Sequence, residues 1–209
     1  TLAHEMGHAI HGFLSEKQGP IYCDYSMSLA ETASTLFEQI AFEAVFEKLS
    51  DKEKIVALEQ KINEEMRTIF NQVAGFKFEK DIHDGVRAKG YLSSAELAAL
   101  QAKNMSDFLG PAVRVTTDNS YTFVGWIHLR LFFYMYTYAY GLLVSKALLH
   151  KYRADKSFWT KIEQFLSAGG NDSPENILKS IGIDVTKPDF WREGILEIER
   201  DIEKLEQLI

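Results

Sequence analysis

The stretch TLAHEMGHAIHGFL, residues 1–14, shows the pattern that decides the fold class of this chain. Its apolar residues recur every three or four positions, which is the spacing of one face of an α-helix. These residues are Leu2, Met6, Ile10 and Phe13. Similar spacing continues along nearly the whole sequence, and few runs alternate with the period of two that a strand shows. We therefore predict an all-α protein whose first helix covers residues 1–14 and has one apolar and one polar face.

Start and stop signals divide the rest of the chain into further helices. Capping residues followed by glutamate or proline mark the starts, and glycines mark the ends. The predicted helices cover residues 26–49, 51–83, 94–109, 123–152 and 158–166, with two closing helices that begin near Pro174 and Pro188. Asp84, Gly85 and Gly90 are expected to end the third helix, and residues 111–122 to form a loop. No repeat, low-complexity tract or linker marks a boundary, so we predict a single helical domain over residues 1–209.

Composition limits the classes of partner. The chain has 209 residues, of which 46% are hydrophobic and 25% charged, as in an ordinary globular protein. The net charge of −7 and the absence of a basic stripe argue against nucleic acid and anionic membranes as partners. The uncharged run 131–145 is shorter than the roughly 20 residues of a membrane span, so we predict a buried helix there. The single cysteine, Cys23, is predicted to be an inert packing side chain and favours a reducing compartment, the cytoplasm by default.

The first helix carries a group of residues typical of metal sites. His4 and His8 are four residues apart, so both imidazoles lie on one helical face and can reach the same ion. Glu5, next to the first histidine, is placed to accept a proton from a water molecule near that ion. Together they form the pattern His-Glu-x-x-His. The pattern also occurs by chance, so a third ligand is needed to identify a site.

Spacing restricts the third ligand. A metzincin would need a histidine six residues after His8, where Leu14 stands. Thermolysin-like and M1 aminopeptidase patterns would place a glutamate at the positions of Met27 and Ser28. Neither pattern fits this chain.

The first suitable carboxylate on a predicted helix is that of Glu31. It lies within the otherwise apolar or small segment 28–35, where an unpaired carboxylate would cost several kcal/mol to bury unless a cation neutralised it. Glu38 shares its helical face seven residues later. The residues alone leave open whether Glu38 is the ligand, an outer partner of one, or a partly solvated surface side chain.

Several motifs in a fixed order resemble one known family. They are HEMGHAIH at 4–11, the segment 22–25, AETAST at 30–35, FE and IH within 78–83, GYLS at 90–93, the aromatic run after His128 and FLSAGG at 165–170. In this order they are similar to the M3 peptidases, of the oligoendopeptidase F type, over nearly the whole chain. The resemblance implies a zincin-like helical bundle, a zinc endopeptidase that cleaves short peptides inside a deep channel.

The same resemblance implies roles for individual residues. His4, His8 and Glu31 would bind one Zn²⁺ ion, and Glu5 would act as the general base. Two imidazoles, one carboxylate and an open water position also fit a catalytic zinc site chemically. The chain would be the C-terminal catalytic portion of a longer protein, whose N-terminal portion packs against it as the other wall of the channel.

A further donor must stabilise the oxyanion, and the resemblance places it in the aromatic run. His128 is implied there, with Tyr134 and Tyr138 chosen because they are four residues apart on one stripe of the predicted helix 123–152. Tyr136 and Tyr140 are expected on another face. Gly141 departs from thimet-type relatives, in which a further tyrosine is expected on this stripe.

Three other histidines have simpler interpretations. His11, three residues after His8, is predicted to be structural or an outer partner, and His83 and His150 to be surface or core residues. An inactive peptide-binding relative or a metal-binding interaction domain is the alternative function. The intact set His4, Glu5, His8 and Glu31 argues against it.

Overall fold

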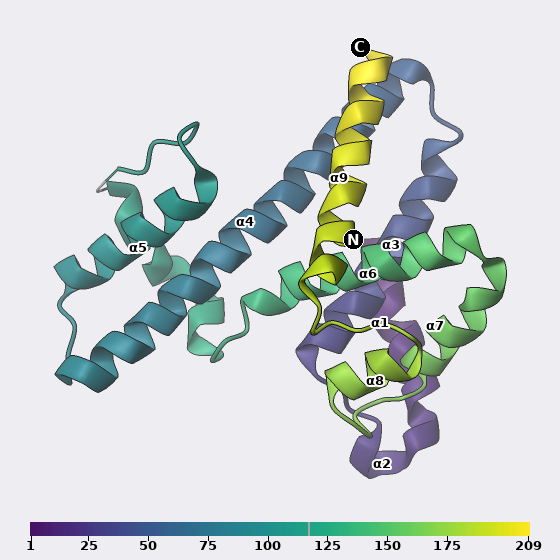
Figure 1. The fold of residues 1–209 in the computed structure, drawn as a ribbon, viewed down its shortest axis with the longest axis horizontal. Coiled ribbons are helices and arrows are strands. Elements are labelled where there is room, and N and C mark those ends of the chain that lie inside the picture. The colour runs from purple at the N-terminus through teal and green to yellow at the C-terminus, as the bar shows by residue number, and fades with distance from the viewer. Residues whose placement is uncertain (117) are drawn as a thin grey trace. The chain divides into compact units, whose positions relative to one another are not determined.

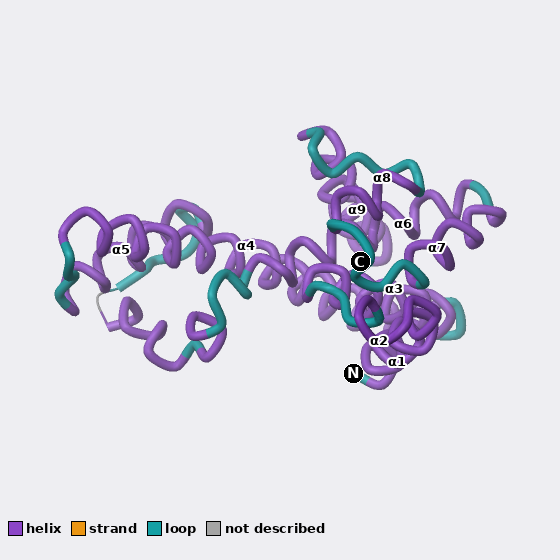
Figure 2. Tube along the Cα trace, turned by 90° about the horizontal axis from the view of Figure 1, so that it is seen from below, coloured by secondary structure: helices purple, strands orange, loops and turns teal. Residues whose placement is uncertain are grey.

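The computed structural model describes residues 1–116 and 118–209 (Figure 1). Its α-helices are α1 (Leu2–Ser15), α2 (Gly19–Tyr22), α3 (Met27–Phe46), α4 (Asp51–Lys89), α5 (Ser94–Leu109), α6 (Tyr136–Ala154), α7 (Trp159–Leu166), α8 (Pro174–Ser180) and α9 (Pro188–Leu208). Short 3-10 helices are η1 (Glu16–Gln18), η2 (Asp118–Gly125), η3 (Ile127–Arg130) and η4 (Lys156–Phe158). The described residues contain no strand, as Figure 2 shows, which confirms the all-α prediction.

The chain forms two compact units. Residues 1–65 and 140–209 make the first, and residues 66–139 make the second. Helices α4 and α6 each contribute residues to both units. The prediction of one catalytic domain over residues 1–209 stays a prediction.

The first unit is organised around α6. Its residues 141–149 are all buried, and one side of this stretch packs against Leu29, Ala33 and Leu36 of α3. Helices α7 and α8 complete the core with Ile162, Phe165, Leu166, Ile177 and Leu178. Leucine and isoleucine dominate this core, and their removal from water is the main force that holds the helices together. No helix in the described part of the chain is long and apolar enough to cross a membrane.

The second unit consists of the later part of α4, helix α5 and the chain from η2 to the start of α6. Helix α5 begins with a capping box: the Ser93 side chain accepts a hydrogen bond from the Glu96 backbone N–H, and the Glu96 carboxylate accepts one from the Ser93 backbone N–H. Helix α5 is held against α4 by Asn104, whose side-chain amide donates to Asp81 Oδ2 at 2.8 Å. Phe78 of α4 is buried against Phe123, with ring centroids 5.2 Å apart.

Two predicted helix boundaries are wrong. Helix α4 does not end at Asp84 but continues through Gly85 to Lys89. A glycine inside a helix costs about 1 kcal/mol, and here it makes room, since a Cβ on Gly85 would lie 2.9 Å from a methyl group of Leu92. The aromatic helix predicted to begin at residue 123 begins only at Tyr136.

The face of α1 that is buried is not the one that its apolar residues would suggest. Of the apolar residues, Leu2 and Phe13 are 81% and 72% exposed, and Met6 is also exposed. The buried positions are Gly7, His11 and Ser15. The side of α1 that carries the histidines therefore packs on the protein. Leu2, Met6 and Phe13 face outward, whereas Ile10 packs against the core.

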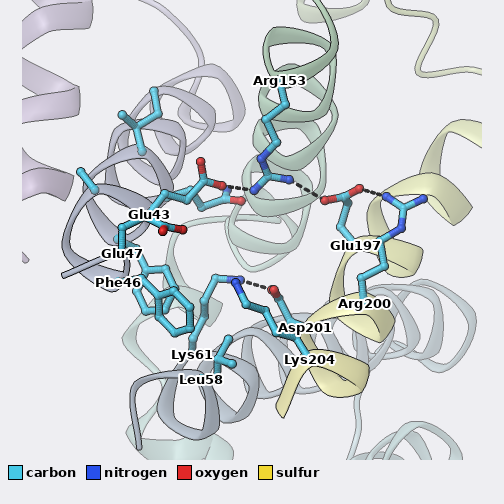
Figure 3. Close-up of a pocket in the computed structure, with 14 residues that line it drawn as sticks. Glu43, Phe46, Glu47, Leu58, Lys61, Arg153, Glu197, Arg200, Asp201 and Lys204 are labelled. Carbon is cyan, nitrogen blue, oxygen red and sulfur yellow. Dashed lines mark hydrogen bonds and ion pairs between the residues drawn. The ribbon is translucent and has the colours of Figure 1, made fainter. Parts of the chain in front are cut away.

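A pocket of about 610 Å³ lies in the first unit, between α3, the beginning of α4, α6 and α9 (Figure 3). Its walls carry many charged groups, and these pair mainly with one another. Glu197 binds both Arg153 and Arg200, Arg153 also binds Glu43, and Lys61 binds Asp201. None of the predicted site residues lines this pocket.

Candidate metal centre

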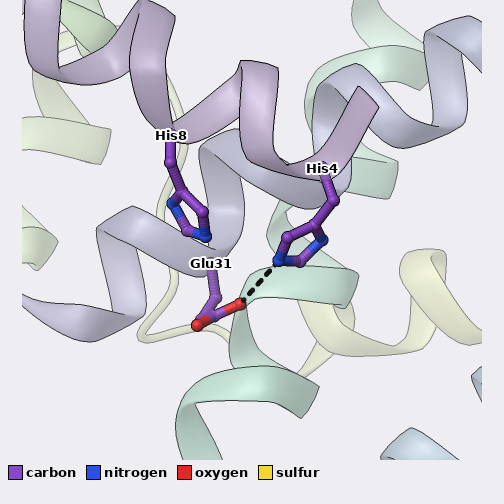
Figure 4. Close-up of side chains that lie close together, drawn as sticks. All are labelled: His4, His8 and Glu31. Carbon is purple, nitrogen blue, oxygen red and sulfur yellow. Dashed lines mark ion pairs between the residues drawn. The ribbon is translucent and has the colours of Figure 1, made fainter. Parts of the chain in front are cut away.

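Helices α1 and α3 bring together two histidines and a glutamate. His4 and His8 project from the same side of α1 toward Glu31 on α3 (Figure 4). One ligand atom from each of the three lies within 4.8 Å of the others. His4 Nε2 is 3.6 Å from Glu31 Oε2, and the two imidazole rings have centroids 5.0 Å apart. A single ion placed among these atoms would meet two nitrogen ligands and one oxygen ligand.

Two glycines allow the backbones to approach this closely. A Cβ on Gly7, between the two histidines, would lie 2.6 Å from Ser34 Cα and 2.9 Å from the Ala33 carbonyl oxygen. On the other side of α3, a Cβ on Gly141 of α6 would lie 2.7 Å from the Glu31 carbonyl carbon. Real Cβ atoms do not approach backbone this closely, so each contact requires glycine. Gly141, which departed from the expected tyrosine stripe, is thus a packing residue behind Glu31.

The protonation states of the group suit a cation. Glu31 is only 3% exposed, and burial raises its pKa, with smaller opposing effects from His4 and from a hydrogen bond to Ser34. Burial also lowers the pKa of His8, and the charge of neighbouring His4 acts in the same direction. Glu31 Oε2 has no hydrogen-bond partner among the described residues. A buried carboxylate oxygen without a donor is costly, and a bound cation would neutralise it.

Two more carboxylates flank the centre. Glu38, one of the two candidates left open by the sequence, places Oε2 3.2 Å from His4 Nδ1, on the ring edge away from Glu31. It can therefore fix the ring and tautomer of His4 while Glu31 faces the other imidazole nitrogen. Glu5 is exposed, and its negative charge acts to raise the pKa of both His8 and Glu31, although burial lowers the pKa of His8 overall.

His11 is fully buried behind the centre. Its ring stacks on Tyr25, with centroids 3.6 Å apart and planes inclined by 11°, and Phe165 lies on another side at 5.7 Å. Neither ring nitrogen has a hydrogen-bond partner among the described residues. Burial lowers the pKa of His11 to about 3, with a smaller effect from His8, so the ring is neutral at pH 7. It packs as an aromatic side chain.

The predicted oxyanion group forms a cluster within the second unit. The rings of His128 and Tyr134 stack with centroids 5.0 Å apart. The hydroxyl of Tyr138 lies 3.4 Å from His128 Nε2 and 3.5 Å from the hydroxyl of Tyr134. The three residues chosen from the sequence thus lie together. The geometric reason given for choosing the tyrosines was wrong, because Tyr134 precedes α6 and shares no helical stripe with Tyr138.

An unusual turn separates η3 from α6 and places this cluster. Phe132 and Phe133 have φ angles of 32° and 56°, a left-handed conformation that costs about 1–3 kcal/mol for a bulky residue. The Phe133 N–H donates to Glu79 Oε1 of α4 at 2.7 Å. The sequence analysis included Glu79 only as part of the motif FE and gave it no role. The available signal was a helical stripe in which Phe76, Glu79 and His83 follow at three- and four-residue spacing.

The chain is similar to known proteins in sequence and in fold. A model of the family described as Peptidase family M3 matches residues 1–196. The chain is 29% identical over 215 residues to an oligoendopeptidase F homolog of Lactococcus lactis and 30% identical over 218 residues to the group B oligopeptidase PepB of Streptococcus agalactiae. Each alignment covers 100% of this chain and 35% of the relative. The crystal structure of oligoendopeptidase-F from Enterococcus faecium superposes with a TM-score of 0.80 at 25% identity, covering 99% of this chain and 38% of that one.

Proposed function

This chain belongs to peptidase family M3, and from that premise we propose that it carries the active centre of a zinc-dependent endopeptidase that hydrolyses short oligopeptides. The observation that carries the proposal is the convergence of His4, His8 and Glu31, whose ligand atoms lie within 4.8 Å of one another. The motif alone required a third ligand, and the buried carboxylate of Glu31, grouped with both histidines, supports its assignment to that role.

The donor set fits zinc. His4, His8 and Glu31 would hold the ion, and three protein ligands leave a coordination position for water or substrate. A set of two imidazoles and one carboxylate suits Zn²⁺ better than it suits Mg²⁺ or Ca²⁺, because those two ions prefer sites made entirely of oxygen ligands. When bound, zinc supplies Lewis-acid chemistry, which polarises a carbonyl group and makes a water molecule more acidic.

The side chains of the chain would perform the proton transfers. Glu5 accepts the proton of the attacking water and then delivers it to the nitrogen of the leaving amine. The negative charge that develops on the carbonyl oxygen requires hydrogen-bond donors. We assign this role to His128, Tyr134 and Tyr138, because they form one cluster with two hydroxyl groups and an imidazole. Glu38 would hold the ring of His4.

The proposal extends to the complete protein. The chain spans 35% of the length of the curated relatives that it matches, so we propose that a further portion of the same protein packs against it and completes the substrate channel. The outward apolar residues of α1, among them Leu2 and Phe13, offer a surface for that contact. The single cysteine, Cys23, is unpaired and supports a reducing compartment such as the cytoplasm.

The test is Glu5→Gln in the complete gene product. Glutamine cannot accept the proton, so we expect kcat for a chromogenic short peptide to fall by about 10²- to 10⁴-fold while the bound zinc remains. Zinc content is measured on the same samples. Glu16→Gln, a change of an exposed glutamate just after α1, is the matched control and should leave kcat unaltered.

Two results would contradict the proposal. Cleavage at the native rate by the Glu5→Gln protein would remove Glu5 from the mechanism. A wild-type protein that binds peptides but does not cleave them, with and without added zinc, would instead establish the alternative of an inactive peptide-binding relative.

A further inference from the structure

We propose that Glu79 is a positioning residue of this enzyme, which sets the geometry of the His128–Tyr134–Tyr138 cluster by holding the turn at Phe132 and Phe133. The inference rests on the proposed function, because it assigns Glu79 a part in the same reaction. It goes beyond that function, because the contact of Glu79 is with the backbone of Phe133 and not with the proposed metal ligands or with the three clustered residues.

Glu79 is built into the protein as an acceptor for the turn. Its side chain is 2% exposed, and its Oε1 receives the backbone N–H of Phe133 at 2.7 Å. The second oxygen, Oε2, has no partner among the described residues. A buried carboxylate with a single donor is a poor stabiliser of a fold, and the group that it holds here is the backbone of Phe133.

The same face of α4 also contacts the ring of Phe133. The Phe133 ring stacks on His83 at 5.1 Å and meets Phe76 edge-on at 5.9 Å. Phe76, Glu79 and His83 thus fix the backbone and the ring of one residue that has a left-handed φ angle. Such strained conformations persist only where the surroundings over-determine them, and they concentrate at functional sites.

The residue after this fixed point is Tyr134. Its direction depends on the backbone at Phe133, and its ring stacks on His128 while its hydroxyl lies 3.5 Å from that of Tyr138. If the Glu79 hydrogen bond is removed, the turn can relax to negative φ angles, and Tyr134 must swing away from His128. Displacements of about 1 Å in a catalytic constellation cost roughly a hundredfold in rate.

The experiment compares three variants of the complete gene product. Glu79→Leu removes the acceptor at similar volume, Glu79→Asp keeps the charge but shortens the reach, and Glu79→Gln keeps an oxygen that accepts the Phe133 N–H. We expect the Leu and Asp variants to lose about tenfold to a hundredfold in kcat with little change in KM, because the oxyanion is bound only in the transition state. Glu79→Gln should keep most of the wild-type activity. Glu64→Leu, at an exposed position of the same helix, is the control.

A double-mutant cycle with Tyr138→Phe tests whether Glu79 acts through the cluster. If it does, the loss in Glu79→Leu/Tyr138→Phe is clearly smaller than the product of the two single losses. Three results would each overturn the inference. The activity losses of the two single variants could multiply in the double variant, Glu79→Leu could keep full activity, or Glu79→Gln could be as impaired as Glu79→Leu. Should Glu79→Leu fail to fold, Glu79→Asp takes its place in the cycle.

A spectroscopic readout separates this inference from the proposed function. In ¹³C-histidine-labelled protein the His128 ring signal, identified by its loss in His128→Gln, is shifted by stacking on Tyr134. We expect that signal to move in Glu79→Leu or Glu79→Asp and to stay in place in Glu79→Gln, whether or not the protein cleaves peptides. An unmoved His128 signal in both the Leu and the Asp variant would refute the positioning role, whereas absent cleavage by the wild type would refute only the peptidase.

Discussion

At Glu31, burial raises the pKa of the carboxyl group, whereas the nearby charge of His4 lowers it. Burial raises the pKa of its carboxyl above the ordinary value of 4.5, so the folded metal-free protein holds the proton more tightly than the unfolded chain does. The stability of the metal-free protein therefore falls as the pH rises from 4.5 through the raised pKa. A bound cation reverses this cost, because it requires the ionised form.

Glu31→Gln should separate stability from metal binding. We expect the variant to lose zinc and activity, yet to be more stable than the metal-free wild type at pH 7 by about 1 kcal/mol or more, since no charge is buried. Chemical denaturation with a chelator present measures the stability, and zinc titration measures the affinity. Glu38→Gln, which alters the partner of His4 instead, should weaken zinc binding by only about 10- to 100-fold. A destabilised Glu31→Gln protein would show that the carboxylate is paired by other means.

His11 changes the stability of the protein with pH in the direction opposite to Glu31, because stability is lost as the pH falls. Its pKa is about 3 in the folded protein and 6.5 ordinarily, so protons bind the unfolded chain first as the pH falls. The contribution of the neutral ring to stability is complete above pH 6.5 and is lost progressively between 6.5 and 3. At pH 5 the loss amounts to about 2 kcal/mol.

His11→Leu should therefore flatten the acid limb of the stability curve. Both ring nitrogens lack partners among the described residues, so an apolar side chain leaves no polar group stranded. We expect a loss of about 1 kcal/mol at pH 7, from the missing stack on Tyr25, and a gain relative to wild type below about pH 5. Unfolding by urea over a pH series, with chelator present throughout, measures both. An unchanged acid limb in His11→Leu would contradict the assignment of this sensitivity to His11.

Among the helices, close approach decides whether the ligands meet. Helix α3 lies against α1 at Gly7 and against α6 at Gly141, and both contacts are to α3 backbone that cannot move aside like a side chain. The carboxylate of Glu31 and the imidazoles of α1 are thereby brought within reach of one ion. Spacing along a sequence gives the face of each helix, but not the distance between two helices.

Gly7→Ala should push α1 away from α3. The added methyl group would meet Ser34 Cα at 2.6 Å, so we expect a loss of about 1–3 kcal/mol in stability together with weaker zinc binding. Gly12→Ala is the matched control on the same helix, because its Cβ would find only the Tyr25 hydroxyl at 3.8 Å. That control should stabilise the protein by about 0.5–1 kcal/mol. Equal zinc affinity in the two variants would show that the close approach at Gly7 is not needed for the site.

Helix boundaries set by local chemistry were predictable, and those set by distant contacts were not. The capping box at Ser93 and the proline at the start of α9 act within a few residues, so the sequence displays them. The aromatic helix was extended too far toward residue 123 because nothing local forbids a helix there. The turn with left-handed φ angles at Phe132 and Phe133 is hydrogen-bonded to Glu79, which is more than fifty residues earlier in the chain.

For the whole chain, the sequence supported the fold class and the residues of the candidate metal group. The all-α class followed from periodicity, and the motif on α1 placed both histidines on one face. It could not show which side of α1 would be buried. Apolar periodicity favoured the side of Leu2 and Phe13, whereas the structure buries Gly7 and His11. A helix can have two interfaces, and apolar periodicity does not show which of the two this chain itself buries.

This arrangement leads to a prediction about the 209-residue polypeptide expressed alone. The candidate metal ligands and their supporting glycines all lie in its first compact unit, so we expect it to bind one zinc ion. The chain spans 35% of its curated relatives, and the outer face of α1 exposes Leu2 and Phe13. Without the portion proposed to cover that face and complete the channel, peptides are poorly positioned, and we expect kcat/KM to be lower than in the complete protein by about tenfold or more. Zinc stoichiometry and cleavage of one short peptide, measured side by side on both proteins, test this. Equal kcat/KM would mean that these residues hold every group the reaction needs.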